Sequence, residues 1–422
     1  MRRSTVLLAG LVSAFIVVNG INALRKGGDF TVFLDAGERF VAGIPLYSGS
    51  GVAAGVVGPP FQGVFFAPFA LLARLDAGLA RLAWYFVNLA ALAWALMAWT
   101  SALGPIAGSR IRWHDWRPEP YGPVVLSLLA VSFPLQTNFE HQNMNLVLLA
   151  LTGAAASALA RDRDGTAGLL IGLASALKAF PGLLLVYLLL RRRWRAVAAG
   201  VFAACALTLL PAFQYGAGGM AAEIRDWLAI STSRGWPARG HNQSLFAMVA
   251  RWYGAEGASD IAARSTPSHL RPHYTWMAAA LCLVAVTFTA LGPWWVRSER
   301  VTPLGIVAVL TLAVLLSPIA WDHYWVLLWP AFLFTCMARD RAWWVPWVFW
   351  IAAILTSGFS RAIVGAHGMA LARSMSVFTW AGLGLLGGTL TLILQGRLAA
   401  SGWRPANSLS VAASGPPSTP RQ

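Results

Sequence analysis

Three carboxylates lie close together in one polar stretch of the sequence, residues 27–47, which reads GGDFTVFLDAGERFVAGIPLY. They are Asp29, Asp35 and Glu38, in a chain with only 16 acidic residues against 32 lysines and arginines. Asp29 follows closely on the first apolar run, where a membrane would meet water. A carboxylate that is partly withdrawn from water there gains proton affinity, which suits a general base. We therefore interpret Asp29 as a base at the mouth of a cavity within the membrane.

Asp29 also has a plainer interpretation, because an aspartate in this position can cap a helix over Phe30–Val41. Asp35 and Glu38 would then lie one turn apart on the water-exposed face of that helix. The residue types alone leave both interpretations of Asp29 open.

Lys178 lies within an apolar region, and the only other lysine of the chain is Lys26. An ionisable group at membrane depth is costly unless an anion pairs with it or its side chain reaches the interface. Pro181 removes a helix hydrogen bond and is expected to break the apolar run Thr166–Leu190 beside Lys178. Since broken helices form ligand sites in membrane proteins, we interpret Lys178 as a ligand of a lipid phosphate. The alternative is a lysine that only snorkels to water.

Two further polar segments carry histidines. Asp322 and His323 stand at the start of an apolar run, where a histidine suits contact with a phosphate or an acceptor hydroxyl. The alternative is a simple cap by Asp322 with His323 at the interface. The segments 140–143 and 241–244 are rich in amides, which suit sugar hydroxyls or loop caps, and neither has the spacing of a zinc motif. No Gly-rich nucleotide fingerprint or Walker motif is present, so a soluble nucleotide donor is not expected.

The composition indicates what must position these residues. With 57% hydrophobic and 11% charged residues and a mean hydropathy of +0.60, the chain cannot be a soluble domain, which would need about a quarter of its residues charged. Apolar runs of about 20 residues match the thickness of a bilayer core. The net charge of +16 is scattered in short clusters between these runs, as in loops that fix membrane orientation and attract anionic lipid. We therefore expect an all-α, polytopic membrane protein that does not bind nucleic acid.

The apolar runs predict ten to twelve spans in a single transmembrane domain over residues 1–400, followed by a disordered cytoplasmic tail over 401–422. Placing Arg191–Arg195 in the cytoplasm puts the loops 25–60 and 214–273, and all the polar clusters above, on the other side. The segments expected to span or enter the membrane are 4–24, 61–75 (short, and so interfacial or re-entrant), 81–103, 121–135, 145–160, 166–190, 197–213, 274–296, 303–316, 324–337, 343–355 and 374–394.

Together, and in their order along the chain, several stretches resemble glycosyltransferase family 87, polytopic enzymes of the GT-C class that use polyprenyl-phosphate sugars. The resemblance covers about residues 20–340. It is carried by Asp29–Phe33 with Ala36-Gly37, Gly43–Tyr47, Pro59-Pro60-Phe61 with Pro68, His141–Asn145, Ala176–Pro181, Asn242–Leu245 and Leu316–His323. One departure is that His141-Gln142-Asn143-Met144-Asn145 stands where the family commonly has Gly-Gln-x-Asn.

The resemblance implies a transmembrane helical bundle of the GT-C type that transfers mannose with inversion to an α-linked product. It implies that Asp29 takes the proton of the acceptor hydroxyl and that His323 lies close to the reaction centre. The donor would be a polyprenyl-phosphate sugar, the acceptor a glycolipid or glycan, and no divalent metal or other cofactor would be needed. Phosphate leaves readily, and a cation such as Lys178 would stabilise its charge. The residues predicted to bind substrate are Lys178, Gln142, Asn145, Asn242, Gln243, Asp322 and Tyr47.

The enzyme is expected in the inner or plasma membrane, with its active site on the non-cytoplasmic face. A transporter or flippase of lipid-linked sugars is the alternative, and it would need polar residues through both leaflets rather than on one side. A purely structural membrane protein is the third possibility, but it would need neither Lys178 nor the carboxylate-rich loop.

Overall fold

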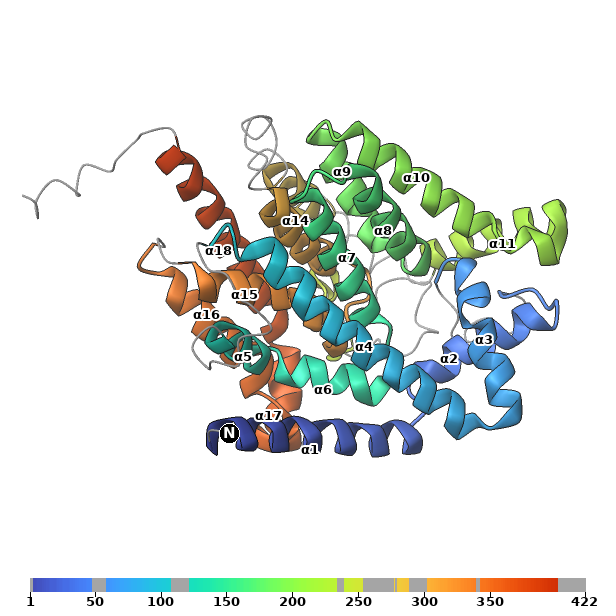
Figure 1. The fold of residues 1–422 in the computed structure, drawn as a ribbon, viewed down its shortest axis with the longest axis horizontal. Coiled ribbons are helices and arrows are strands. Elements are labelled where there is room, and N and C mark those ends of the chain that lie inside the picture. Colours follow the sequence, from blue (N-terminus) through green and yellow to red (C-terminus); the bar gives the residue numbers. More distant parts are fainter. Residues whose placement is uncertain are drawn as a thin grey trace, which may run out of the picture.

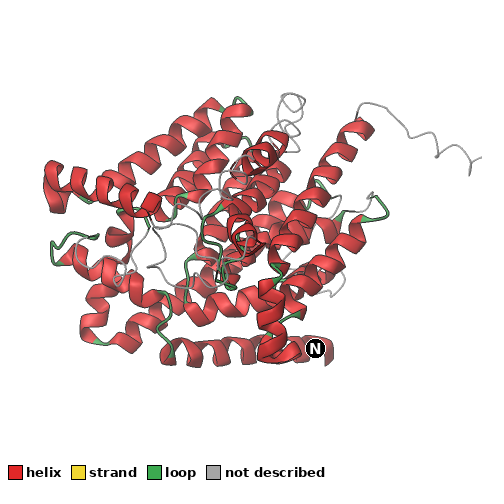
Figure 2. Ribbon diagram, turned by 180° about the vertical axis from the view of Figure 1, so that it is seen from behind, coloured by secondary structure: helices red, strands yellow, loops and turns green. Residues whose placement is uncertain are grey.

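The chain folds into an all-helical bundle in a computed structural model, as the ribbon views show (Figure 1, Figure 2). The structure describes residues 3–47, 58–107, 121–233, 239–252, 277, 279–287, 302–338 and 342–400. Within these ranges the only β pairing is an isolated bridge between Asn242 and Trp321. The predicted all-α fold is confirmed.

The first four helices bring the carboxylate-rich loop against the bundle. They are α1 (Arg3–Arg25), α2 (Phe30–Val41), α3 (Phe61–Leu75) and α4 (Ala77–Leu103). The predicted helix over Phe30–Val41 is confirmed, and it packs closely on α3 because Gly37 has no side chain: a Cβ there would lie 2.6 Å from Phe66 O. Phe30 stacks on Trp84 of α4 with ring centroids 5.8 Å apart, so α2 is fixed to both following helices.

The middle of the chain contains two of the breaks that shape the site. Its helices are α5 (Gly122–Ala130), α6 (Ser132–His141), α7 (Asn145–Leu159), α8 (Asp164–Leu177), the 3₁₀ turn η2 (Phe180–Gly182), α9 (Leu183–Leu190), α10 (Trp194–Leu209) and α11 (Ala212–Ser233). The predicted break beside Lys178 is confirmed, since α8 ends at Leu177 and the chain resumes as η2 and α9.

A second break was not expected from the sequence. The single run predicted over 121–135 is bent by 64° between α5 and α6, and α6 continues to His141. Pro134 explains the bend, because it has no N–H to donate to Ala130 O. Thr356 and Ser357 donate their hydroxyls to that carbonyl instead, at 2.6 and 2.8 Å.

The last part of the chain encloses the second histidine. Its elements are α12 (Leu245–Trp252), α14 (Thr302–Leu316), the 3₁₀ helix η8 (Asp322–Leu328), α15 (Trp329–Met337), α16 (Val345–Ala353), the π-helical turn η9 (Ile354–Gly358), α17 (Arg361–Ser374) and α18 (Val377–Ala400). Helix α17 was not anticipated, and α11 and α12 lie in the stretch 214–273 that was expected to be a loop. The expected tail, 401–422, and most of 274–296 lie outside the described residues.

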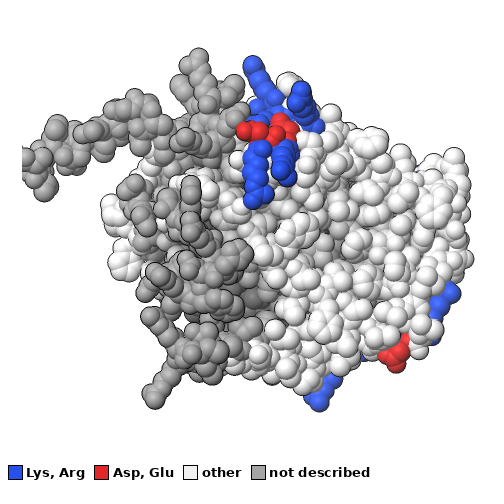
Figure 3. Space-filling view, viewed as in Figure 1, with Lys and Arg blue, Asp and Glu red and all other residues white. Residues whose placement is uncertain are grey.

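Two described helices, Ala77–Leu103 and Val377–Gln395, are long and apolar enough to cross a membrane, and the number rises to five if each of three bent helix pairs is one span. Five shorter apolar helices accompany them. In Figure 3, the charged side chains of the described residues lie at opposite edges of one face and leave its broad middle uncharged. These features belong to a membrane protein, and the predicted count of ten to twelve spans remains a prediction.

Candidate active site

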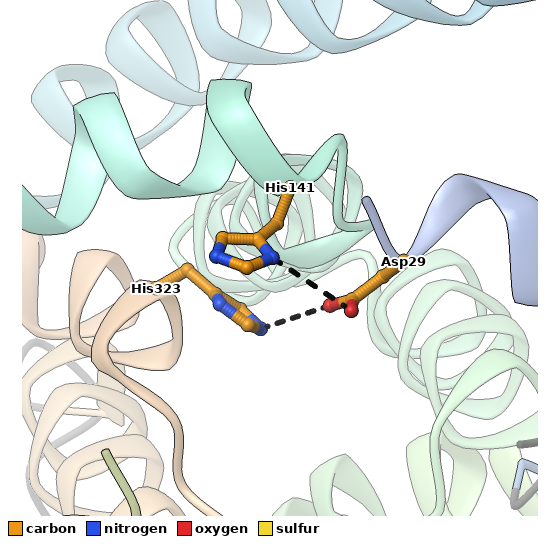
Figure 4. A group of neighbouring side chains, drawn as sticks. All are labelled: Asp29, His141 and His323. Atoms are coloured by element: carbon orange, nitrogen blue, oxygen red, sulfur yellow. Dashed lines mark ion pairs between the residues drawn. The ribbon is translucent and has the colours of Figure 1, made fainter. Parts of the chain in front are cut away.

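Asp29, His141 and His323 come together from three segments that are distant in the sequence (Figure 4). His323 Nε2 lies 3.3 Å from Asp29 Oδ2, and His141 Nδ1 lies 3.9 Å from Asp29 Oδ1. The two imidazole rings face each other with centroids 5.2 Å apart. The side chain of Asp29 is 34% exposed, that of His323 only 3% and that of His141 47%. The carboxylate therefore lies between a buried histidine, His323, and an accessible one, His141.

Asp29 does not use its side chain as a helix cap. It occupies the N-cap position of α2 but makes no capping hydrogen bond. Its Oδ2 accepts a hydrogen bond from Asn143 Nδ2 at 2.7 Å, and its backbone N–H donates to His141 O at 2.8 Å. Gly28 permits this approach because its φ is +50°, and a Cβ there would lie 2.5 Å from His141 O. The chain therefore aims the carboxylate across the loop between α6 and α7.

Lys178 turns inward where α8 ends. Its Nζ donates to Asn143 Oδ1 at 3.2 Å and to Asn145 Oδ1 at 2.9 Å. The same nitrogen lies 3.6 Å from the ring centroid of Tyr324, a favourable cation–π distance. Asn143 therefore bridges the lysine and Asp29, and the lysine side chain is held within the protein instead of reaching to water.

In the loop His141–Asn145, the Gln142 side chain contacts α1, whereas the Asn145 side chain contacts Lys178 and the main chain of His323. Gln142 is in the left-handed conformation, with φ 49°, and its Nε2 donates to Ala23 O at 2.7 Å. Its carbonyl accepts from Trp84 Nε1 at 2.7 Å, so its described contacts fix the loop to α1 and α4. Asn145 has a different place, since its Nδ2 donates to His323 O at 3.1 Å while its oxygen accepts from Lys178.

Asn143 was not among the residues predicted from the sequence to bind substrate, although it contacts both Asp29 and Lys178. The sequence did show that this loop, 141–145, contains three amide side chains. Spacing could not show which of these amides points toward the carboxylate, because the left-handed turn at Gln142 decides that.

The surroundings of His323 disfavour the charged form of its imidazole. Burial lowers the pKa of its imidazole well below the ordinary value, and the nearby Lys178 and His141 lower it further. A neutral imidazole beside Asp29 can accept or donate one hydrogen bond without adding a positive charge.

The other predicted residues form a neighbouring network rather than contacting Asp29. Asp322 is buried and paired with Arg373, and it does not cap η8, because Trp321 holds the capping position. Asn242 and Gln243 bind the main chain of the segment before His323: Asn242 Oδ1 accepts from Ala320 N at 2.9 Å, and Gln243 N donates to Ala320 O at 2.8 Å.

Tyr47 lies in a separate place. Its hydroxyl donates to Gly58 O at 2.6 Å, and its ring packs in a small cluster with residues of α2. No described contact joins Tyr47 to Asp29 or to either histidine of the site.

Asp29, His141 and His323 are also residue types that bind metal ions, and one donor atom from each lies within 4.8 Å of the others. Sequence spacing gave no sign of this group, because each member comes from a different segment. In the structure, Asn143 directs an amide N–H at Asp29 Oδ2, and Lys178 Nζ donates to the oxygen of the same amide.

Known proteins that this chain resembles are mannosyltransferases, and the family whose model matches is one of glycosyltransferases. The model of glycosyltransferase family 87 matches residues 57–318. A polyprenol-phosphate-mannose-dependent α-(1-2)-phosphatidylinositol mannoside mannosyltransferase of Mycobacterium tuberculosis H37Rv is 27% identical over 340 residues, which are 78% of this chain and 74% of that protein. The protein of the same description from Mycolicibacterium smegmatis is 26% identical over 361 residues, 81% of this chain and 74% of its own.

A third relative is described as a phosphatidylinositol pentamannoside mannosyltransferase with the same polyprenol-phosphate-mannose dependence. It comes from Mycobacterium tuberculosis CDC 1551 and is 29% identical over 293 residues, 67% of this chain and 59% of its own. The range matched by the family model contains Asn143 and Lys178 but begins after Asp29 and ends before His323. The comparisons therefore bear on the kind of protein and leave the roles of single residues open.

Proposed function

Because this chain belongs to glycosyltransferase family 87, we propose that it transfers mannose from a polyprenyl-phosphate donor to a hydroxyl of a glycolipid or glycan acceptor. The donor and sugar follow the relatives, which are described as polyprenol-phosphate-mannose-dependent mannosyltransferases. Their acceptors are phosphatidylinositol mannosides, so a mannosylated glycolipid is the first acceptor to test. None of these relatives is a transporter of lipid-linked sugars.

The observation that carries the proposal is the placement of Asp29. A general base must reach the proton that it removes and must be open to substrate. Asp29 is partly exposed, its Oδ2 is held by Asn143, and its Oδ1 faces the accessible His141. A hydroxyl that approaches from the open side can therefore meet a fixed carboxylate.

The proposed step balances without a further reagent. The acceptor oxygen forms a bond to the anomeric carbon while the bond from that carbon to the phosphate oxygen breaks. Asp29 takes the hydroxyl proton, and polyprenyl phosphate leaves with the electron pair of the broken bond. Attack opposite to the leaving group inverts the anomeric carbon, as the family resemblance implies.

Lys178 suits the leaving phosphate. Its Nζ is held by two neutral asparagine oxygens and the face of Tyr324. An anionic phosphate oxygen is a stronger acceptor than either amide and can replace one of them. We assign His323 the orientation of reacting groups, because it is neutral, buried and beside Asp29.

We further place the site toward the non-cytoplasmic face of the inner or plasma membrane, in a bundle of ten to twelve spans. Helix α7 leads from Asn145 to the charged turn 161–163, and α8 leads back from Asp164 to Lys178. The site and the arginine-rich turns therefore lie at opposite ends of these helices, which supports the positive-inside orientation. Each helix is only about 22 Å long, against a hydrocarbon core of about 30 Å, so the site would be recessed.

We also propose that the reaction needs no divalent metal, because the carboxylate, the lysine and the neutral histidine suffice for the step above. One experiment tests the function and this point together. Purified protein in lipid vesicles is given polyprenyl-phosphate [¹⁴C]mannose and a phosphatidylinositol mannoside, with and without EDTA, and GDP-mannose replaces the donor as the control.

The expected result is an α-linked mannosylated product from the lipid donor alone, in equal amounts with and without EDTA. The absence of product from the lipid donor would contradict the function. Loss of product in EDTA that Mg²⁺ or Mn²⁺ restores would instead show that the reaction uses a divalent metal, for which Asp29, His141 and His323 are the candidate ligands.

A further inference from the structure

Asp322, the residue before His323, is a buried carboxylate with a single strong partner. It is 2% exposed, and its Oδ2 forms an ion pair with Arg373 Nη2. Its Oδ1 has no hydrogen-bond partner among the described residues, and His241 Nδ1 lies 3.4 Å from its Oδ2. A carboxylate taken so far out of water needs its cation, because removing one partner of a buried pair leaves an uncompensated charge.

Arg373 comes from the last turn of α17, a helix whose other side chains are mostly exposed or half-buried. Only Ala372 and Arg373 of that helix are buried. The guanidinium of Arg373 therefore anchors the end of α17 in the bundle, and the residue that it meets there is Asp322.

Gln243 closes the connection through the main chain. Its N–H donates to Ala320 O at 2.8 Å, and its Nε2 donates to Arg373 O at 2.9 Å. Its Oε1 accepts from Phe378 N at 3.2 Å. One glutamine thus holds the segment that leads to His323 and the junction of α17 with α18, and the Asp322–Arg373 pair joins the same two segments a second time.

His323 has a described hydrogen bond at its main chain but none at its Nε2. Its Nε2 lies 3.3 Å from Asp29 Oδ2 but has no hydrogen-bond geometry to any described residue. On one side, its carbonyl is held by Asn145 at 3.1 Å. On the other side, the main chain is held through the side chain of Asp322. The ring is therefore aimed by the backbone on both sides rather than by a bond of its own.

We propose that Arg373 is a positioning residue, which aims His323 at Asp29 by holding Asp322. The inference rests on the proposed function only in taking Asp29 and His323 as the reacting neighbourhood. In this inference the end of α17 keeps the histidine in place. The sequence analysis did not predict that this helix belongs to the site.

The test compares Arg373→Gln, Arg373→Lys and the double variant Arg373→Gln/Asp322→Asn with Arg361→Gln. Arg361 is the matched control, because it is an exposed arginine at the other end of α17. In mannosyl transfer, Arg373→Gln is expected to lower kcat about 100-fold, since a misplacement of about 1 Å can cost that much. The donor KM should stay within about threefold, because Arg373 does not touch the donor in this account.

Two further variants distinguish a loss of His323 positioning from a general loss of folding. Arg373→Lys keeps a cation for Asp322 and should recover part of the lost kcat. The double variant has no unpaired buried carboxylate, and it should exceed Arg373→Gln about tenfold, because an amide pair replaces the orphaned charge. Arg361→Gln should match the wild type.

A second readout does not depend on sugar transfer. The protein is treated with diethyl pyrocarbonate, and the rate of modification of each histidine is mapped by mass spectrometry, with the exposed His367 as internal reference. His323 should be protected in the wild type and in Arg361→Gln, and it should react about ten times faster in Arg373→Gln at temperatures where the variant is folded.

Unchanged kcat together with unchanged protection of His323 in folded Arg373→Gln would overturn the inference. Loss of transfer with His323 still protected would also overturn it, since Arg373 would then act on the substrate directly. If Arg373→Gln does not fold, Arg373→Lys is judged by the same two readouts. A wild type that transfers no mannose would contradict the proposed function, and the modification rates would still decide the role of Arg373.

Discussion

Asn143 connects the two charged groups of the site, since one amide donates to Asp29 and accepts from Lys178. Asn143 thus fixes the carboxylate and the lysine relative to each other, and because its amide is neutral it adds no charge to the site. A base and a cation that act on one substrate gain from such a fixed distance, because orientation lowers the entropy cost of the reaction.

Replacing Asn143 by Ala should lower kcat roughly 10- to 100-fold, because both charged side chains lose a fixed partner. The measurement is the rate of mannosyl transfer at saturating donor. Gln136→Ala is the control, since Gln136 is an amide on the exposed face of the preceding helix and its described partner is Glu140. Equal rates for the two variants would show that Asn143 does not order the site.

His323 makes a prediction about pH and stability. Its pKa is lower in the folded protein than its ordinary value of about 6.5. Between these two values the unfolded chain binds more protons than the folded one, so folding stability is lost as pH falls below about 6.5. Thermal unfolding between pH 7.5 and 5 should show a falling Tm in the wild type.

In His323→Gln this fall should be smaller, because the residue that resists protonation has been removed. His367→Gln is the control, as an exposed histidine that should leave the pH dependence unchanged. The same slope in His323→Gln as in the wild type would mean that the buried imidazole does not set this dependence.

At the scale of the helix, α8 depends on close contact with α10. A Cβ at Gly168 or Gly172 would collide with the backbone of α10, at Ala196 O and Gly200 O. Glycines four residues apart on one helix permit this kind of approach in membrane proteins. Since α8 ends at Leu177, directly before Lys178, this contact also sets where the lysine enters the site.

Gly172→Val should therefore destabilise the protein by about 1–3 kcal/mol, because overpacking at a helix contact forces the backbones apart. Gly165→Ala is the matched control, since a Cβ at Gly165 meets nothing within 4 Å. The measurement is the Tm of the purified variants in detergent. A Gly172→Val protein as stable as the control would refute the close packing of α8 on α10.

The sequence predicted those elements whose cause is local. Helix α2, the 15-residue helix α3 and the break beside Lys178 all followed from apolar length or from Pro181. The bend between α5 and α6 was not predicted, although Pro134 is a local cause that the sequence shows. Helix α17 gave no comparable signal, because its sequence is too polar for a span and it is held largely by Arg373.

For the site, the sequence predicted roles for Asp29, Lys178 and His323, and the structure brings these residues together around Asn143 and Asn145. It did not identify Arg373 or single out Asn143. Both depend on contacts between segments far apart in the chain, which neither periodicity nor spacing expresses. The same limit explains why Asn242 and Gln243, predicted to bind substrate, are found on the main chain of the segment before His323.

At the scale of the whole molecule, the account requires the site and the arginine-rich turns to face opposite sides of the membrane. A reporter fused after Arg195 should be cytoplasmic, so green fluorescent protein there should fluoresce and alkaline phosphatase should be inactive. A fusion after Tyr47 should give the opposite pattern. Active phosphatase after Arg195 would invert the orientation and move the site to the cytoplasmic side.

The central claim, that Asp29 removes the proton of the acceptor, is tested most directly by mannosyl transfer in Asp29→Asn. The amide side chain has the same size as the carboxylate and should leave the backbone conformation unchanged, but it cannot take a proton. The kcat should therefore fall at least about 100-fold, the usual contribution of a general base. Asp35→Asn is the control, because Asp35 pairs with Arg39 on the same helix. Loss of transfer in Asp29→Asn alone is the predicted result, and equal transfer by both variants would contradict the account.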